Sequence, residues 1–395
     1  MVVRVPFFTT ANVFVMQSRI VIICITLLVS SYVNAQPLLW NIKNIDGIKE
    51  NKSSKLYKLI IQKANAYLEA PLIDVTDKSS QFVNDTHYYV SLATYFWPDS
   101  TRNDGKYILR DGYINPEREK YDRVKLFDLC DRLTYLSLAF YMGHQDKYFD
   151  EFVKLLIGWF CDSNTYVYPN LEYAQIVPGY NKNQGNRMGL IEARSYNDIL
   201  ESIRLVDMIR PIDRSIMASV KWWFYEFSRW MVESKLGLAD DNAIDTHGTS
   251  YDLVLLNIAQ FTNQKDLAIR ITDNFYKRRL TTQIAEDGSM HEELKRTNSL
   301  SYSILNLSFI LDFCIIQQNM GVSYYKQKKT IIDRAIAFIR SHLSDNNTWT
   351  YPQMSSVGWE KKRLEYETRR LLRLDHSNKN EALQIELDSE YNMLK

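Results

Sequence analysis

The chain has 395 residues, 46% of them hydrophobic and 24% charged, and its formal net charge is +1. This is the composition of a globular protein with enough apolar material for a large core. It excludes the strong overall basic charge of nucleic-acid-binding domains, so we expect no nucleic-acid partner. Glycine (13) and proline (9) are scarce, which favours helices over a turn-rich β fold. Aromatic residues make up 13% of the chain and suit sugar stacking, although core packing is the simpler explanation.

The N-terminus has the pattern of a secretory signal peptide. Arg19 precedes the apolar run 20–29, and the small residues Val33 and Ala35 occupy the cleavage positions. We therefore expect residues 1–35 to be a signal peptide and residues 36–395 to form a single domain that is secreted or periplasmic. We expect no later segment to be long and apolar enough to span a membrane.

The rest of the chain is dominated by helical periodicity. The near-continuous apolar run 300–316 predicts a helix buried between neighbours, whereas the amphipathic segment 325–344 predicts an outer helix. Alternating inner and outer helices indicate stacked hairpins, so the predicted fold is all-α, an (α/α) toroid or barrel of six to seven helical hairpins. The predicted helices are 54–69, 124–142, 147–161, 190–209, 213–236, 249–262, 266–286, 299–319, 325–344 and 359–374.

Two long segments, 71–123 and 162–189, interrupt the helical pattern and are rich in Asn, Asp, Tyr, Pro and Arg. Loops of this length in a folded domain usually have a function, so we expect both to form cleft walls at one mouth of the toroid. The mature chain keeps Cys130, Cys161 and Cys314, all within apolar helical segments. We expect these to be buried free thiols and not ligands of a metal.

The motifs of several enzyme classes are absent. The stretch 291–294 reads HEEL and lacks the second histidine of a zinc-protease helix, and the sequence has neither a phosphate-binding glycine loop nor a Gly-x-Ser-x-Gly elbow. We therefore predict no metal and no organic cofactor. A pair of carboxylates acting in glycoside hydrolysis stays open.

Three residues could form a catalytic group. His247 opens an apolar helix, and Arg296 and Tyr302 flank a cap signal at Thr297 or Asn298. Residues six apart lie about 240° apart around one helix, so Arg296 and Tyr302 converge only if the helix begins between them. Each residue alone is more typical of a structural role, namely a bonded histidine, a packed tyrosine and a solvated or paired arginine.

Several stretches together resemble the alginate lyase-like superfamily of polysaccharide lyases, which are helical toroids that cleave uronate polymers by β-elimination. The resemblance covers roughly residues 80–310. The stretches that show it are YFWPDS, RDGYINPE, YPNLEYAQIVPG, THGTSYD and DGSMHEELKRTNSLSYSILNL.

The resemblance implies a role for each member of the group. β-Elimination removes the weakly acidic C5 proton of a uronate, so the enolate-like intermediate must be stabilised, a base must take the proton and an acid must protonate O4. His247 is then the base or a carboxylate contact, and Tyr302 is the acid, or both acid and base. Arg296 would hold the carboxylate and lower the pKa of Tyr302.

The resemblance also implies residues that bind the sugar. Four of them lie in the second long segment, namely Asn170, Tyr173, Gln175 and Arg187. Three lie on the opposite wall, namely Tyr95, Trp97 and Arg110.

The sequence departs from the family pattern before His247. The family commonly has Asn-Asn-His-Gly there, and this chain has Asp245-Thr246-His247-Gly248. Three explanations are open: activity is lost; Asn242, or Asn170 with Gln175, supplies the missing amide; or Asp245 has a raised pKa and donates a hydrogen bond when protonated. We expect activity to survive because His247, Arg296 and Tyr302 are all present.

The sequence thus predicts a polysaccharide lyase that acts on an anionic, uronate-containing polymer such as alginate or glucuronan. Two alternatives are a glycoside hydrolase of the same toroid class with paired carboxylates, and a non-catalytic glycan-binding relative.

Overall fold

A computed structural model describes residues 36–79, 82–101, 103–343, 349–355 and 357–375. The predicted signal peptide, residues 1–35, lies outside them. Contacts within the chain separate residues 1–36 from residues 37–395, and only the second unit is described below. Its α-helices are α2 Ile42–Glu50, α3 Lys55–Leu68, α4 Arg123–Gly143, α5 Asp146–Phe160, α6 Ser195–Ile209, α7 Arg214–Glu233, α8 Lys235–Asp241, α9 Thr246–Phe261, α10 Lys265–Phe275, α11 Thr281–Gln283, α12 His291–Leu294, α13 Ser299–Asn319, α14 Tyr324–Ser341 and α15 Val357–Asp375.

The predicted all-α class is confirmed, and every predicted helix has a counterpart. Two predicted helices are composite. A 3₁₀ helix, η3 (Arg187–Arg194), precedes α6, and a π-helical turn, η4 (Tyr276–Leu280), separates α10 from α11. Helices α2, α8 and α12 were not predicted, because they are too short to show a clear apolar period.

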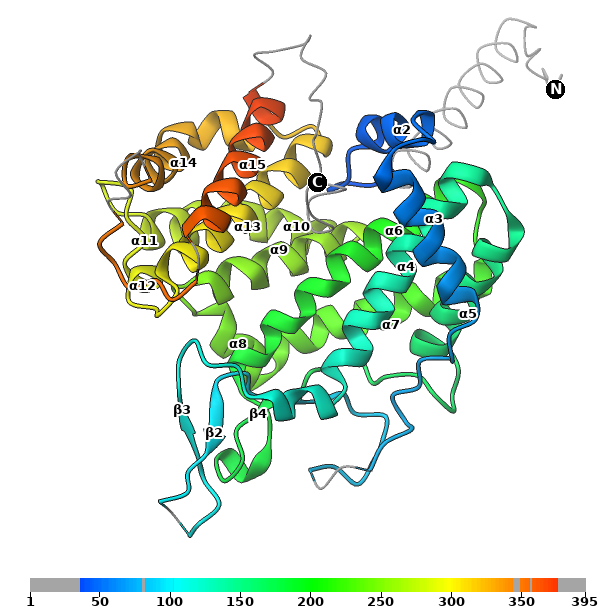
Figure 1. The fold of residues 1–395 in the computed structure, drawn as a ribbon, viewed down its shortest axis with the longest axis horizontal. Coiled ribbons are helices and arrows are strands. Elements are labelled where there is room, and N and C mark those ends of the chain that lie inside the picture. Colours follow the sequence, from blue (N-terminus) through cyan, green and yellow to red (C-terminus); the bar gives the residue numbers. More distant parts are fainter. Residues whose placement is uncertain (1–35, 80–81, 102, 344–348, 356, 376–395) are drawn as a thin grey trace, which may run out of the picture. The chain divides into compact units, whose positions relative to one another are not determined.

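The helices are arranged as an inner row with outer helices packed against it (Figure 1). Within the row, α4 packs on α6, α6 on α9 and α9 on α13. The outer helices α3 and α5 pack on α4, α7 and α10 on α9, and α14 and α15 on α13. Closure of this row into a toroid stays a prediction.

The inner helix α13 is apolar enough to need explanation. By length and composition it could cross a membrane, with a mean hydropathy of 1.7 over 18 residues, so the expectation that no later segment would meet this test is wrong. However, 83% of that window is buried in the folded protein, between α9, α14 and α15. Its apolar character is therefore that of a core helix.

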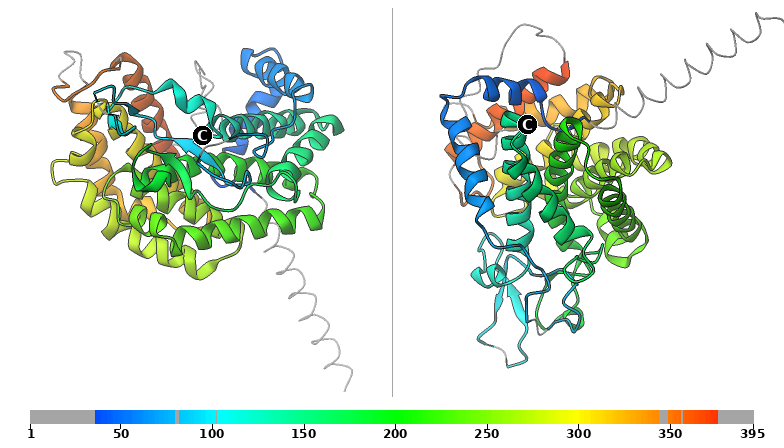
Figure 2. Two further views of the ribbon diagram at one scale, coloured as in Figure 1. Left: turned by 90° about the horizontal axis from the view of Figure 1, so that it is seen from below. Right: turned by 90° about the vertical axis from the view of Figure 1, so that its right-hand side faces the viewer.

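The two long segments meet in a small parallel pairing. Strand β1 (Val90–Leu92) pairs with β4 (Tyr173–Ile176), so the two segments lie side by side at one end of the helices. Strands β2 (Phe96–Pro98) and β3 (Tyr107–Leu109) form an antiparallel hairpin. Figures 1 and 2 show this hairpin extending beyond the helix ends, near α8.

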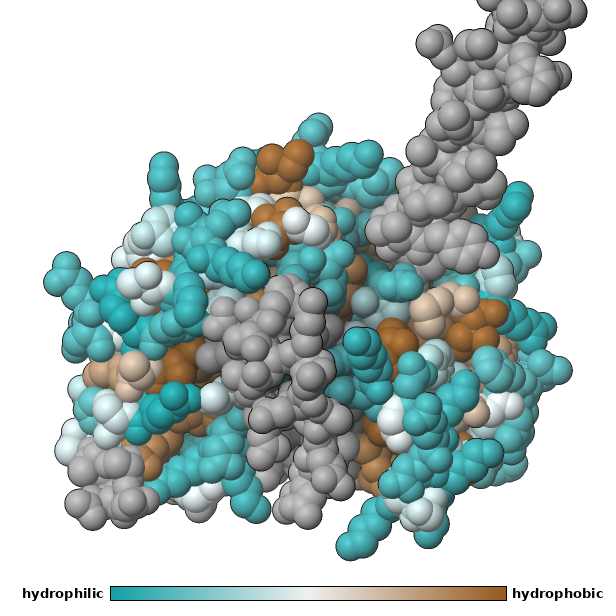
Figure 3. Space-filling model, turned by 90° about the horizontal axis from the view of Figure 1, so that it is seen from above, coloured by the Kyte–Doolittle hydropathy of each residue, from teal (hydrophilic) through white to brown (hydrophobic). Residues whose placement is uncertain are grey.

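The face in Figure 3 is mainly hydrophilic, with hydrophobic side chains in small separate groups. The described residues contain no disulfide, so Cys130, Cys161 and Cys314 keep their thiols, as predicted, but only Cys314 is fully buried.

Candidate active site

Arg296 and Tyr302 converge as the sequence predicts, because α13 begins at Ser299, between them. Arg296 Nη2 donates to the Tyr302 hydroxyl at 2.8 Å, and the guanidinium carbon lies 3.8 Å from the centre of the phenol ring. The predicted cap is wrong in its chemistry, however. The Asn298 side chain does not cap α13 but accepts from the backbone N–H groups of Met354 and Ser355.

A distant segment caps α13 instead. The Ser299 N–H donates to the Pro352 carbonyl at 3.0 Å, and the Leu300 N–H donates to Gln353 Oε1 at 2.9 Å. These bonds satisfy N–H groups that have no partner inside a helix. The first turn of α13, which holds Tyr302, is therefore fixed by residues about fifty positions later in the chain.

Asp111 holds Arg296 in place, and it was not predicted as a site residue. Its two oxygens accept from Arg296 Nη2 at 2.7 Å and Nε at 3.2 Å, and Oδ2 also accepts from the Thr297 N–H and hydroxyl. Burial alone would raise the pKa of Asp111, but these bonds outweigh it and lower that pKa. The only sequence signal was its place in RDGYINPE.

Tyr302 is a protonated phenol in the free protein. Its hydroxyl lies 2.7 Å from that of Tyr95, which follows β1. Burial is the largest cause that raises the pKa of Tyr302, and Tyr95 adds to it; the charge of Arg296 lowers the pKa but is outweighed. The predicted effect of the Arg296 charge is therefore present, but burial and Tyr95 set the net direction, and Asp111, which pairs with Arg296, also raises the pKa of Tyr302. The phenol therefore carries its proton at neutral pH, as a general acid must before it donates one.

His247 lies in the first turn of α9, beside the carboxylate that caps this helix. Asp245 Oδ1 accepts from the His247 backbone N–H at 3.0 Å and lies 3.3 Å from the ring Nδ1. A carboxylate at Nδ1 orients the imidazole and leaves Nε2 for a proton. The side chain is 17% exposed, so a sugar can reach it.

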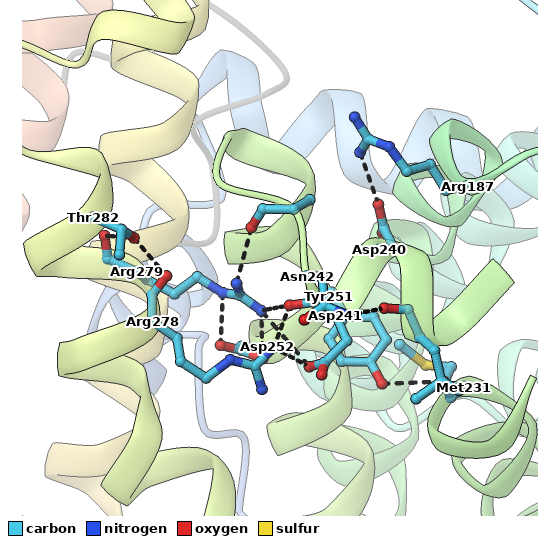
Figure 4. Close-up of polar contacts among 12 residues, drawn as sticks. Arg187, Met231, Asp240, Asp241, Asn242, Tyr251, Asp252, Arg278, Arg279 and Thr282 are labelled. Carbon is cyan, nitrogen blue, oxygen red and sulfur yellow. Dashed lines mark hydrogen bonds and ion pairs between the residues drawn. The ribbon is translucent and has the colours of Figure 1, made fainter. Parts of the chain in front are cut away.

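Arg187 lies between two carboxylates. Its Nη2 is 3.5 Å from Asp245 Oδ2, and its Nη1 is 3.4 Å from Asp240 Oδ1 (Figure 4). Burial raises the pKa of Asp240 to about 6 against the charges of His247 and Arg187. Burial also acts on Asp245, but bonds and charges from His247 and Arg187 outweigh it and hold that pKa well below its ordinary value.

These carboxylates bear on two earlier hypotheses. In the free protein the pKa of Asp245 is lowered and not raised, which does not favour a protonated Asp245 that donates to the substrate. Paired carboxylates for hydrolysis are not favoured here either, because Asp240 is only 1% exposed and lies beneath Arg187.

The three candidates for the missing amide differ in whether their side chains already have hydrogen-bond partners. The Asn242 side chain donates to the Leu238 carbonyl at 2.8 Å. Gln175 is 8% exposed with a φ of 49°, and its backbone N–H donates to Ser91 Oγ. Asn170 Oδ1 accepts from the Glu172 N–H at 3.2 Å, while its amide nitrogen has no partner among the described residues. Among these three side chains, Asn170 therefore has the amide nitrogen that is available to donate.

The remaining predicted sugar contacts lie on the strands or next to them. Tyr173 opens β4, with its ring edge-on to Tyr88 at 4.9 Å. Trp97 and Arg110, from the β2–β3 hairpin, line a cavity of about 300 Å³ together with Asp111 and Tyr113. The Arg110 guanidinium lies 5.7 Å from the Trp97 ring centre, and neighbouring Asp111 joins this cavity to Arg296.

The structure thus assembles two clusters. One comprises Tyr95, Asp111, Arg296 and Tyr302, and the other Arg187, Asp240, Asp245 and His247. No direct hydrogen bond or ion pair joins them among the described residues, but α9 and α13 are packed together and the Thr246 N–H donates to buried Glu293, just before α13, at 2.7 Å. The described part of the chain contains no group of three or more His, Cys, Asp or Glu suited to a metal.

Comparisons with known proteins show the family to which the chain belongs. The sequence profile of the alginate lyase family matches residues 74–349. A solved alginate lyase from Bacteroides ovatus is 31% identical, with a TM-score of 0.81 over 87% of this chain and 92% of that one. Alginate lyase A1-III from Sphingomonas species A1 is 13% identical over 73% of this chain and 77% of that one, and its TM-score of 0.44 is too low to inform the site. No curated protein matches the chain. The chain belongs to the alginate lyase family of polysaccharide lyases.

Proposed function

We propose that the protein cleaves a uronate-containing polymer, of the alginate or glucuronan type, by β-elimination. The observation that supports this most is the contact between Tyr302 and Arg296, a protonated phenol held beside a fixed guanidinium. β-Elimination needs an acid for the leaving oxygen and positive charge near the developing enolate, and this pair supplies both.

The second cluster supplies a base. His247 presents Nε2 while Asp245 holds Nδ1, so the imidazole can accept the C5 proton. The electron pair of the C5–H bond then forms the C4–C5 double bond, the C4–O4 bond breaks, and Tyr302 protonates O4. Asn170 and Arg187 are the proposed partners of the substrate carboxylate.

Two measured signals distinguish elimination from hydrolysis and from binding without cleavage. Mature protein is incubated with alginate, polymannuronate and glucuronan, and both ultraviolet absorbance and new reducing ends are followed. Elimination gives both signals together, because each cleavage leaves one unsaturated uronate. New reducing ends without absorbance would indicate hydrolysis, and binding with neither signal would indicate a glycan-binding relative.

We also propose export, to the periplasm or outside the cell. The support is the sequence pattern of Arg19, the apolar run 20–29 and the small residues at Val33 and Ala35. N-terminal sequencing of the exported protein is expected to begin at Gln36. A mature protein that retains residues 20–29 would contradict this.

A further inference from the structure

The loop that precedes His247 is held by three side chains from one short segment. Arg278 and Arg279 both donate to the Asp241 carbonyl, and Arg279 also donates to the Ala243 carbonyl at 2.9 Å. Gln283 Nε2 donates to the Asp245 carbonyl at 3.0 Å. Every second carbonyl from 241 to 245 is therefore bound from η4 and α11. Figure 4 shows the two arginines converging on Asp241.

Gln283 has further partners. Its Oε1 accepts from the Thr249 hydroxyl of α9 at 2.9 Å and from the Asn306 amide of α13 at 2.8 Å. Gln283 is 5% exposed, and both partners are fully buried. Low local dielectric strengthens such a network and makes each lost partner costly.

These bonds link the two halves of the candidate site. Asn306 lies four residues after Tyr302 on α13, so both occupy the same face of the helix one turn apart. Asp245, at the other end of the link, bonds the backbone and ring of His247. From Tyr302 to His247 the path runs through Asn306, Gln283 and Asp245.

We propose that Gln283 is a positioning residue, which sets where His247 lies relative to Tyr302. The proposal rests on the function proposed above, in which both side chains act on one sugar. A base and an acid must each lie within hydrogen-bond reach of their atoms. Gln283 is buried, and its hydrogen-bond partners among the described residues are Thr249, Asp245 and Asn306, so its effect is on geometry.

Kinetics test the proposal with near-isosteric variants. Gln283→Met removes all three bonds while preserving volume. We expect kcat to fall about 10- to 100-fold with little change in KM, because a misplacement of about 1 Å can cost 10²-fold. Thr249→Val is the matched control: it removes one bond to Gln283 but leaves the link between Asp245 and Asn306, so kcat should stay near that of the wild type. Equal losses in both variants, or a change confined to KM, would overturn the proposal.

A second readout is independent of turnover. In protein with ¹³C-labelled histidine, Asn306→Leu is expected to move the His247 ring signal, although Asn306 lies on a different helix. The same substitution in the Gln283→Met background should leave that signal unmoved. Asn306→Ser replaces it if the leucine variant does not fold.

The two readouts separate the possible failures. The positioning role is overturned if the His247 signal does not move in the Asn306→Leu variant, or if it shifts equally in both backgrounds. If the wild type cleaves no uronate polymer, the proposed function fails, and the spectrum still decides whether Gln283 couples the two halves.

Discussion

Asp111 and Arg296 are 185 residues apart in the chain and form a two-point ion pair, with Nη2 2.7 Å from Oδ1 and Nε 3.2 Å from Oδ2. A bidentate pair of this kind fixes the plane of the guanidinium. It thereby fixes the Nη2 hydrogen that Tyr302 accepts. The loop that follows β3 and holds Asp111 thus determines the geometry of the candidate acid.

Asp111→Asn is expected to lower kcat roughly tenfold, because Arg296 loses a two-point hold that keeps it beside Tyr302. Since the pair is partly exposed, we expect a loss of only about 1 kcal/mol in the free energy of unfolding at pH 7. The pKa of Asp111 is lowered on folding. Its contribution to the free energy of unfolding is therefore present above about pH 4 and is lost as the pH falls through the lowered pKa. Steady-state kinetics and urea unfolding measure the two effects.

Asp146→Asn controls for loss of one carboxylate. Asp146 is 80% exposed and pairs with Arg210 on the surface. Asp146→Asn should change neither kcat nor the free energy of unfolding appreciably. Equal kinetic effects in both variants would mean that Asp111 acts only through net charge.

Gly248→Ala is expected to displace the start of α9. An added Cβ would lie 2.2 Å from the Ala243 carbonyl oxygen and 2.8 Å from Arg279 Nη1, which holds that loop. We expect a loss of about 1–3 kcal/mol in unfolding free energy, and a lower kcat because His247 is the preceding residue.

Gly47→Ala, in α2, is the matched control because nothing lies within 4 Å of its added Cβ. It should stabilise the protein by roughly 0.5–1 kcal/mol, since alanine favours a helix over glycine. Thermal or urea unfolding distinguishes the two. A Gly248 variant as stable and active as the wild type would contradict the close packing.

Asp240→Asn is expected to change how stability depends on pH. The pKa of Asp240 is raised to about 6 on folding, so the wild type loses stability as pH rises from about 4 to 6. A shift of two pKa units corresponds to up to roughly 3 kcal/mol. The variant lacks this loss, so its stability relative to the wild type should increase over that window and then level off. Urea unfolding at pH 4 to 8 measures the unfolding free energy of both proteins. If the two curves of unfolding free energy against pH are parallel, the raised pKa of Asp240 is ruled out.

Asp245→Asn tests the departure from the family pattern. It removes an ionised carboxylate beside Arg187 and introduces an amide that can donate to a substrate carboxylate. We expect KM for a uronate polymer to fall several-fold, about 1 kcal/mol of binding. Asp150→Asn, on the exposed side of α5, controls for net charge. An unchanged or higher KM would show that Asp245 serves binding as a carboxylate.

The limits of sequence reasoning follow from the kinds of contact involved. Helix positions were predictable because apolar periodicity is local, and so was the convergence of Arg296 and Tyr302, which needs only a helix start between them. Asp111 and Gln353 were not, because they meet the start of α13 from distant segments. The net direction of the Tyr302 pKa shift was not predictable either, because burial by the fold outweighs the lowering effect of its charged neighbour Arg296.

The central claim is that Tyr302, held by Arg296, protonates the leaving oxygen of a uronate during elimination. Ultraviolet absorbance is followed while wild type and Tyr302→Phe act on alginate, polymannuronate and glucuronan, with polymer binding measured in parallel. The account predicts rising absorbance for the wild type on at least one polymer, and none for Tyr302→Phe, which still binds. A wild type that produces reducing ends without absorbance, or a Tyr302→Phe variant that retains substantial activity, would contradict it.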